Sequence, residues 1–312
     1  MPIIRDNVSK LAYSGTESMM NNLEARLDAK LLEDINIGRA VMLFDPNAKK
    51  KIYWTHNLPG QMRIVEVSEN RTLHIDNRWK YFDRIVFVSK WQQEQYSKHY
   101  KFSDNDLAKT TVLQNAIDPI PDHKKPDDKI RLIYTSVPER GLDLLYEAYN
   151  RIYTKYNIEL QVFSSYQIYG WPTGDIVHRQ LLDRVKSHPG IRYHSSVPNN
   201  IIREQLQRSH IFAYPSTFLE TSCIALIEAM SAGCICVHPN IAALPETSGG
   251  HTNMYEYNRN RNIHIDMFEQ ELIRAVELVS SIDMTNQKKY IEDNYSWTKR
   301  IPEWIKFINE LK

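Results

Sequence analysis

Short apolar runs and amphipathic stretches alternate along the chain, and each kind predicts a different element. In the first half the apolar runs predict strands at 40–44, 51–56, 84–89 and 110–115. The stretches with a helical spacing of apolar positions predict helices at 17–29, 77–81 and 90–100. Strands that alternate with helices indicate parallel sheets, so this half favours an α/β domain.

The alternation pauses at residues 118–129, where three prolines and a run of charges predict a surface linker. Beyond this linker the apolar runs predict strands at 131–136, 159–165, 191–195, 211–215 and 234–239. Helices are predicted at 142–156, 174–187, 199–207, 269–280 and 302–311. The second half therefore predicts another α/β domain.

Composition places the chain among globular proteins. Of 312 residues, 42% are hydrophobic and 25% are charged, which is typical of a folded and water-soluble protein. The formal net charge of +1 gives no general attraction to nucleic acid, and we predict no nucleic-acid partner.

The cysteines and the hydropathy profile bear on location. The three cysteines, Cys223, Cys234 and Cys236, fall in the predicted core of the second domain and form no disulfide framework. The opening MPIIRDNVSK has no apolar signal region, and no segment reaches membrane-spanning length. We expect a cytoplasmic protein, with contact at a membrane surface left open.

The segment PSTFLETSCIALIEAMSAG at 215–233 holds the strongest chemical signal. Glu220 precedes a predicted helix and Glu228 lies inside it, with Ser222 expected as its N-cap and Gly233 as its left-handed end. Free N–H groups at the start of such a helix attract a phosphate. Ionised carboxylates accept hydrogen bonds from sugar hydroxyls. The segment therefore suits a phosphate next to hydroxyl-rich groups.

This segment, with ALPE at 243–246, resembles the E-x7-E signature of the family 4 glycosyltransferases, which are retaining enzymes of the GT-B fold. The resemblance implies two Rossmann-like domains that face a central cleft. We assign 1–122 to a reduced acceptor-side domain, joined by the C-terminal helix 296–312, and 123–295 to the nucleotide-sugar domain. The first domain is called reduced because the apolar strand that usually precedes its glycine loop is short or missing.

Three further motifs carry the same resemblance. SGTE resembles the glycine-rich loop of the family, which implies donor contacts from Ser14, Gly15 and Thr16. WTHNLPG places His56 where the family has a histidine facing the donor sugar. SVPERGLDLL places Arg140 where the family grips the donor diphosphate, while Ser136 stands where many relatives have a second arginine.

The resemblance also assigns roles along the E-x7-E segment. Glu228 is expected to bind the ribose and Glu220 the donor sugar, with Arg140 holding the phosphates. The donor-binding set is completed by four residues at strand ends and at the helix start: Val197, Thr221, Ser222 and Cys223. His56, Arg140 and Glu220 form the predicted catalytic set.

These features predict a retaining glycosyltransferase that moves a sugar from a nucleotide-diphosphate sugar to a glycan, a lipid or another hydroxyl acceptor. Asp104 and Asp106 are spaced like a metal motif, but their context favours a helix cap, so we predict no metal and no other cofactor. Two alternatives stay open: a non-catalytic nucleotide-sugar-binding protein and a GT-B sugar-nucleotide epimerase.

Overall fold

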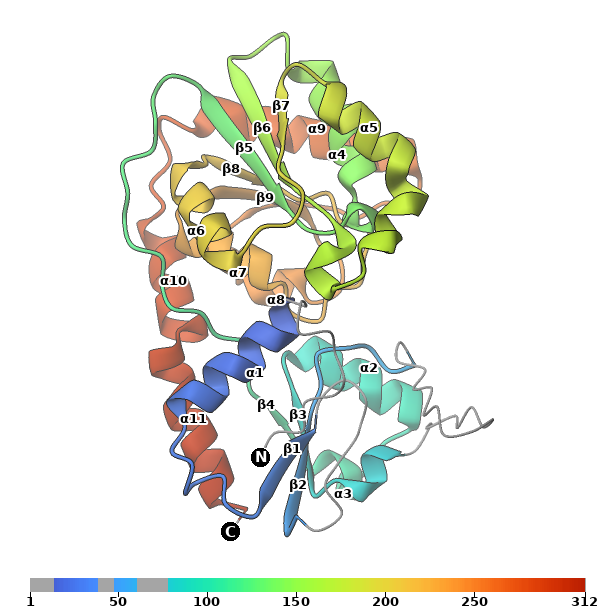
Figure 1. Cartoon of the computed structure of the whole chain (residues 1–312), viewed down its shortest axis with the longest axis vertical. Helices are drawn as coiled ribbons and strands as arrows, with labels where there is room; N and C mark the ends of the chain where they lie inside the picture. Colours follow the sequence, from blue (N-terminus) through green and yellow to red (C-terminus); the bar gives the residue numbers. More distant parts are fainter. Residues whose placement is uncertain (1–13, 39–47, 61–77, 312) are drawn as a thin grey trace. The chain divides into compact units, whose positions relative to one another are not determined.

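The computed structural model describes residues 14–38, 48–60 and 78–311. Two expectations, the strand at 40–44 and the shortened strand before Ser14, lie outside these residues. The chain divides into two compact units. Both are α/β units built on parallel sheets, as the sequence predicts (Figure 1).

The first unit contains the described residues between Ser18 and Ala116, together with the segment that begins at Trp297. Its sheet has four parallel strands in the order β1 (Ile35–Gly38), β2 (Lys50–Trp54), β3 (Arg84–Phe87) and β4 (Thr110–Val112). Its helical elements are α1 (Gly15–Arg26) from Ser18 onward, the 3-10 turn η1 (Arg78–Tyr81), α2 (Lys90–Tyr100), α3 (Asp104–Leu107) and α11 (Trp297–Asn309).

Helix α11 supplies part of the core of this unit. The Trp304 ring meets the Trp54 ring edge-on at 4.9 Å, and the Arg26 guanidinium lies 5.2 Å from the centre of the Trp297 ring. The apolar pattern predicts a helix from Pro302 and the family resemblance implies one over 296–312; α11 begins at Trp297 and includes the proline, close to the second expectation. Trp297, Trp304 and Ile308 share one buried face across the proline, and this burial favours the longer helix.

The second unit contains Ile117–Ser296 and the described residues up to Glu17. Its six parallel strands follow the order β10-β9-β8-β5-β6-β7. In chain order they are β5 (Ile130–Thr135), β6 (Ile158–Phe163), β7 (Ile191–Tyr193), β8 (Ile211–Ala213), β9 (Ile235–Pro239) and β10 (Asn253–Tyr255). The predicted linker before β5 contains no helix or strand.

Helices cover both faces of this sheet (Figure 1). One group is α4 (Leu142–Ile152), α5 (Arg179–Ser187) and α9 (Arg261–Leu278), and the other is α6 (Asn199–Arg208), α7 (Ile224–Ser231) and α10 (Thr285–Tyr295). Shorter helical elements are η2 (Pro138–Arg140), η3 (Tyr166–Tyr169), η4 (Pro172–His178) and α8 (Leu244–Ser248).

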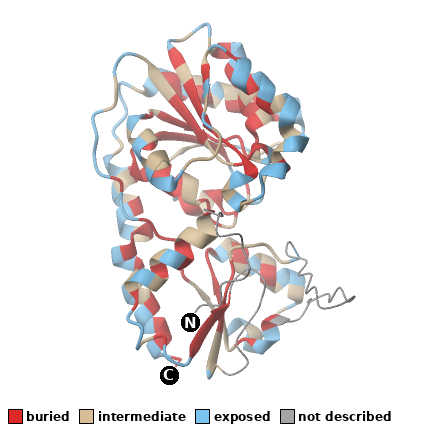
Figure 2. Cartoon of the chain, in the orientation of Figure 1, coloured by how far each residue is buried: buried red, intermediate tan, exposed pale blue. Residues whose placement is uncertain are grey.

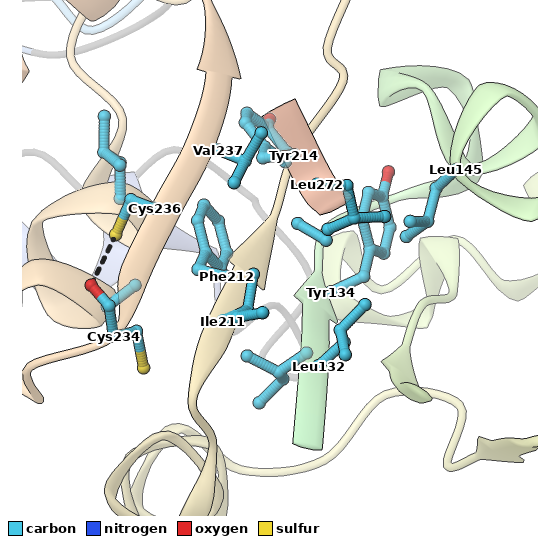
Figure 3. Close-up of a cluster of buried hydrophobic side chains, with 14 of the residues drawn as sticks. Leu132, Tyr134, Leu145, Ile211, Phe212, Tyr214, Cys234, Cys236, Val237 and Leu272 are labelled. Atoms are coloured by element: carbon cyan, nitrogen blue, oxygen red, sulfur yellow. Dashed lines mark hydrogen bonds between the residues drawn. The ribbon is translucent and has the colours of Figure 1, made fainter. Parts of the chain in front are cut away.

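Burial follows from this layering. Strands β8 and β9 are buried along their length, and β5 is buried in its middle (Figure 2), as expected for a parallel sheet covered on both sides. Leu132 and Tyr134 of β5 lie in one cluster with Ile211 and Phe212 of β8 (Figure 3). The three cysteines are free and buried in the same core.

Several elements differ from the prediction. Helix α9 begins at Arg261 rather than at 269. Asn260 is its N-cap, and its side-chain oxygen accepts hydrogen bonds from the N–H groups of Asn262 and Ile263. The helix predicted from Gly174 is a 3-10 segment followed by α5. Strands β1 and β10 and helix α10 were not predicted, because the two strands are short and α10 is mostly polar.

A helix that crosses a membrane needs about 20 consecutive, mostly apolar residues. Within residues 14–38, 48–60 and 78–311, none of the helices has the length and apolar character needed to cross a membrane.

Candidate functional site

The strand order of the second unit reverses between β5 and β8. These strands are neighbours, yet the chain runs from β5 through β6 and β7 on one side before it crosses to β8 on the other. In open parallel sheets, ligands bind beyond the carboxyl ends of the strands at such a reversal. The loops that follow β5 and β8 therefore flank the position where the topology predicts a ligand.

The loop after β5 turns sharply at Gly141. This residue has φ +94°, in the left-handed region, and separates η2 from the start of α4. A Cβ atom here would lie 2.3 Å from the carbonyl oxygen of Pro215, in the loop that follows β8. Glycine is required for both reasons, and the contact brings the loops after β5 and β8 together.

These two loops are joined by an ion pair between Arg140 and Glu220. Nη1 of Arg140 donates to Oε1 of Glu220 at 2.7 Å, and the same oxygen accepts the hydroxyl of Tyr214 at 2.6 Å. The side chain of Glu220 is only 7% exposed and that of Arg140 is 21% exposed. The structure thus unites two residues predicted from separate motifs.

The surroundings fix the charge of this cluster. Burial lowers the pKa of Arg140, but the charge of Glu220 opposes it and the net result is a raised pKa. Burial also raises the pKa of Tyr214, so its hydroxyl stays protonated and donates. The guanidinium is further held by the Phe218 ring at 4.2 Å and the Tyr169 hydroxyl at 3.3 Å. Arg140 is therefore a permanent, partly enclosed cation.

Helix α7 starts close to this pair, but not at the expected cap. Cys223 is the N-cap, rather than Ser222, and its side chain makes no capping bond. The helix begins one residue later than predicted because Cys223, with φ −80° and ψ 98°, is still extended. Gly233 does follow the helix in the left-handed conformation, with φ +67°. Glu220 precedes the helix and Glu228 lies inside it, as predicted.

Glu228 occupies a second polar cluster. Asn199, the first residue of α6, donates from Nδ2 to both carboxylate oxygens at 3.2 and 3.1 Å. Arg203, one turn later, donates from Nη1 to Oε1 at 3.2 Å. Burial raises the pKa of Glu228, and the charge of Arg203 acts against this rise. Asn199 and Arg203 were not predicted as site residues, because polar residues at the start of a helix carry no specific motif.

Residues of the SGTE segment lie at the start of α7. Ser14 precedes α1, and its hydroxyl donates to the carboxylate of Glu17. A Cβ atom on Gly15 would lie 2.9 Å from Cδ1 of Ile224, the first residue of α7. Thr16 follows in the first turn of α1 and is half-buried.

Three other predicted residues lie on the loops of this unit. Ser136 directly follows β5, and Thr221 precedes the N-cap of α7; both are half-buried. Val197 lies shortly before α6 and packs against the core. Their roles in donor binding stay predictions.

His56 belongs to the other unit, where it follows β2, and its ring lies 4.7 Å from the Trp54 ring. Gln92 of α2 fixes the segment on both sides of this histidine. Its fully buried amide donates to the carbonyls of Thr55 at 3.2 Å and Asn57 at 2.8 Å and accepts the Val88 N–H at 2.8 Å. Gln92 was not predicted from the sequence, because a glutamine in an amphipathic helix resembles a surface residue.

Of the two residues considered for a metal motif, Asp104 and Asp106, the second has a structural role. Ser103 and Asp106 form a reciprocal capping box at the start of α3, which the sequence context favoured. In the described part of the chain, no group of three or more histidine, cysteine, aspartate or glutamate side chains could hold a metal ion.

Comparisons with known proteins agree with this geometry. Residues 130–276, which contain Arg140, Glu220 and Glu228, match a family model described as Glycosyl transferases group 1. One subunit of the human phosphatidylinositol N-acetylglucosaminyltransferase is 28% identical over 200 residues, which is 62% of this chain and 39% of the relative. The chain therefore spans well under half of that protein.

Solved structures show the same fold at low identity. A glycosyltransferase from Rickettsia africae has a TM-score of 0.66 and 13% identity, covering 99% of this chain and 84% of that one. HepE from Anabaena, solved with UDP-glucose, has a TM-score of 0.62 and 11% identity, covering 84% of this chain and 72% of that one. The fold is that of GT-B glycosyltransferases.

Proposed function

We propose that this protein is a retaining, family 4-type glycosyltransferase that moves a sugar from a nucleotide-diphosphate sugar to a hydroxyl acceptor. The observation that carries this proposal is the ion pair between the partly enclosed Arg140 and the buried Glu220 at the strand-order reversal. Glu228 lies further along the same βαβ segment, inside α7. The match of residues 130–276 to group 1 glycosyltransferases supports the same interpretation.

Each donor group has a proposed partner. Arg140 and the first N–H groups of α7 would hold the diphosphate, because a fixed cation and a helix N-terminus both favour phosphate. Oε1 of Glu220 is already used by Tyr214 and Arg140, while no described residue hydrogen-bonds to Oε2. That second oxygen would accept a hydroxyl of the donor sugar, and Glu228 would accept the ribose hydroxyls.

The chemistry would take place on one face of the sugar. The acceptor oxygen forms its bond to the anomeric carbon on the side from which the diphosphate leaves, and a phosphate oxygen takes the acceptor's proton. Arg140 and the α7 amides would stabilise the charge that develops on the leaving group. His56 is proposed to contact the donor sugar during turnover. The proposal assigns phosphate neutralisation to these groups, so activity should persist in EDTA.

The names of the similar proteins guide the choice of substrates. The human relative is named for transfer of N-acetylglucosamine to phosphatidylinositol, and HepE was solved with UDP-glucose. We propose UDP-sugars as the first donors to test, and glycans or lipid-linked hydroxyls as the first acceptors. A lipid acceptor would bring a cytoplasmic protein into peripheral contact with a membrane.

A thermal-shift panel of UDP, GDP, ADP and their sugars, followed by turnover assays, tests the proposal. A nucleotide at about 100 times its Kd should stabilise the protein by roughly 2.7 kcal/mol. Binding with neither hydrolysis nor transfer would indicate a non-catalytic binding protein. An altered sugar on the nucleotide, formed without acceptor, would indicate an epimerase. If no nucleotide of the panel binds, the proposed function is wrong.

A further inference from the structure

Glu228 is held by two side chains that have no role in the proposed reaction so far. Asn199 donates to both of its oxygens and Arg203 donates to Oε1, all within 3.1–3.2 Å. Nη2 of Arg203 donates at 2.6 Å to the backbone carbonyl of Asp118, at the start of the linker. The guanidinium is therefore anchored at both ends, and it cannot turn away from Glu228 without breaking a second bond.

We propose that Arg203, assisted by Asn199, is a positioning residue that keeps Glu228 ionised and oriented to accept the ribose hydroxyls of the donor. This inference rests on the proposed function, because it concerns how the same site distinguishes ribose from deoxyribose.

Burial explains why Glu228 needs such a partner. The glutamate is only 5% exposed, and a buried carboxyl favours the neutral form. Burial indeed raises its pKa, while the charge of Arg203 and the hydrogen bonds from Asn199 and Arg203 lower it. A protonated carboxyl would lose part of its acceptor capacity for sugar hydroxyls. Arg203 thus favours the form of Glu228 that recognises ribose.

The other neighbours of α7 do not replace this charge. Strand β9 and helices α8 and α10 also pack against α7, but among the described residues Arg203 alone acts on Glu228 by its charge. Acceptor capacity for a ligand still remains. A carboxylate offers about four acceptor positions. Nδ2 of Asn199 donates to both carboxylate oxygens, and Nη1 of Arg203 donates to Oε1. These three contacts leave an acceptor position of the carboxylate for a ribose hydroxyl.

The test compares nucleoside diphosphates with their 2′-deoxy counterparts. Calorimetry measures Kd for UDP and 2′-deoxy-UDP, and for the matching GDP and ADP pairs, at pH 8, 7 and 6. The terminal phosphate titrates in this range as well, but it is common to both members of a pair. The ratio of the two Kd values therefore reports ribose recognition and cancels the titration of the phosphate.

For wild type we expect the ribonucleotide to bind about tenfold or more tightly, as for loss of one hydrogen bond to a charged group. In Arg203→Met the ratio should fall toward one, and it should fall further as the pH drops from 8 to 6. In Arg203→Lys the ratio of the two Kd values should vary with pH much as it does in wild type, because the positive charge is retained. Asn199→Ala should lower the ratio without the added pH dependence.

Arg208→Met is the matched control, since Arg208 lies exposed on the same helix. A wild-type ratio at every pH in Arg203→Met would overturn the inference. If that variant does not fold, unchanged ratios in both Arg203→Lys and Asn199→Ala would overturn it. A wild-type protein that binds both members of a pair equally also refutes it but leaves the glycosyltransferase proposal standing. Failure of wild type to bind any pair refutes the proposed function itself.

Discussion

Arg140→Ala is the substitution that tests the site most directly. It removes one half of an ion pair whose glutamate side chain is 7% exposed and whose arginine side chain is 21% exposed. Loss of one partner of a buried pair costs about 3–5 kcal/mol, because the other charge is left without compensation. Tyr214 still donates to Glu220, and Arg140 is partly open to water, so we expect the lower end, about 3 kcal/mol.

Stability and catalysis can be separated with companion variants. Arg140→Ala/Glu220→Gln removes the stranded charge as well, so its stability loss should be smaller than the sum of the two single losses. Arg140→Lys retains the charge but lacks the planar fork that holds two phosphate oxygens. We expect it to lower turnover even where the protein stays folded. Arg140→Ala should lower turnover by roughly 10²-fold or more, as for loss of a preorganised donor to the leaving group.

The assays are urea unfolding at neutral pH and donor hydrolysis or transfer at saturating donor. Arg179→Ala is the matched control, because the Arg179 side chain is 81% exposed and its ion pair with Asp183 spans 3.7 Å. Ser136→Arg, which adds a cation on the same loop, should partly restore nucleotide affinity to Arg140→Ala. Wild-type turnover in Arg140→Ala would show that the donor phosphates bind elsewhere and would refute the assignment of the site.

Four further predictions follow from the same geometry. Glu228→Ala should abolish stabilisation by free nucleotide, while Glu220→Ala should spare it and weaken the sugar nucleotide; calorimetry showing normal donor binding in both would contradict the assignment. His56→Ala should lower kcat with little change in nucleotide Kd, and an unchanged kcat would remove it from the reaction. Removal of residues 296–312 should lower the melting temperature well beyond the effect of losing a loose tail, because it deletes the buried Trp297; an unchanged melting curve would argue against α11 as part of the core. Burial lowers the pKa of His238 to about 4. The unfolded chain, with a histidine pKa of about 6.5, then binds more protons between these values, so the free energy of unfolding should fall by about 3 kcal/mol as the pH drops through this range. Urea titrations of wild type and His238→Asn test this, and equal pH slopes would contradict it.

The sequence predicts the parts of this site that depend on local patterns. Gly233 ends α7 in a left-handed conformation, and Glu220 and Glu228 lie before and inside that helix, because apolar spacing and a glycine are local signals. The predicted cap was wrong, since Ser222 and Cys223 differ by one position in a stretch where either could begin the helix. Patterns locate helices well and locate their first residue less well.

The partners of these residues were not predictable in the same way. Arg140 meets Glu220 across 80 positions of sequence, and Asn199 meets Glu228 across 29. These contacts depend on β8 returning to lie beside β5, and hydrophobic periodicity does not reveal strand order. Gln92 illustrates the same difficulty, because its hydrogen bonds to Thr55 and Asn57 join segments 35 to 37 residues apart.

The two glutamates differ in a way that matters for donor binding. Glu220 is paired with Arg140, and that arginine is also the proposed phosphate ligand. A donor would therefore compete with Glu220 for the guanidinium, while Tyr214 continues to hold the glutamate in place. Glu228 is held instead by Asn199 and Arg203, which the proposed donor contacts leave undisturbed. In this proposal the carboxylate that binds ribose is already held in place before the donor arrives, whereas Arg140 exchanges Glu220 for the donor phosphates and Oε2 of Glu220 accepts the sugar hydroxyl.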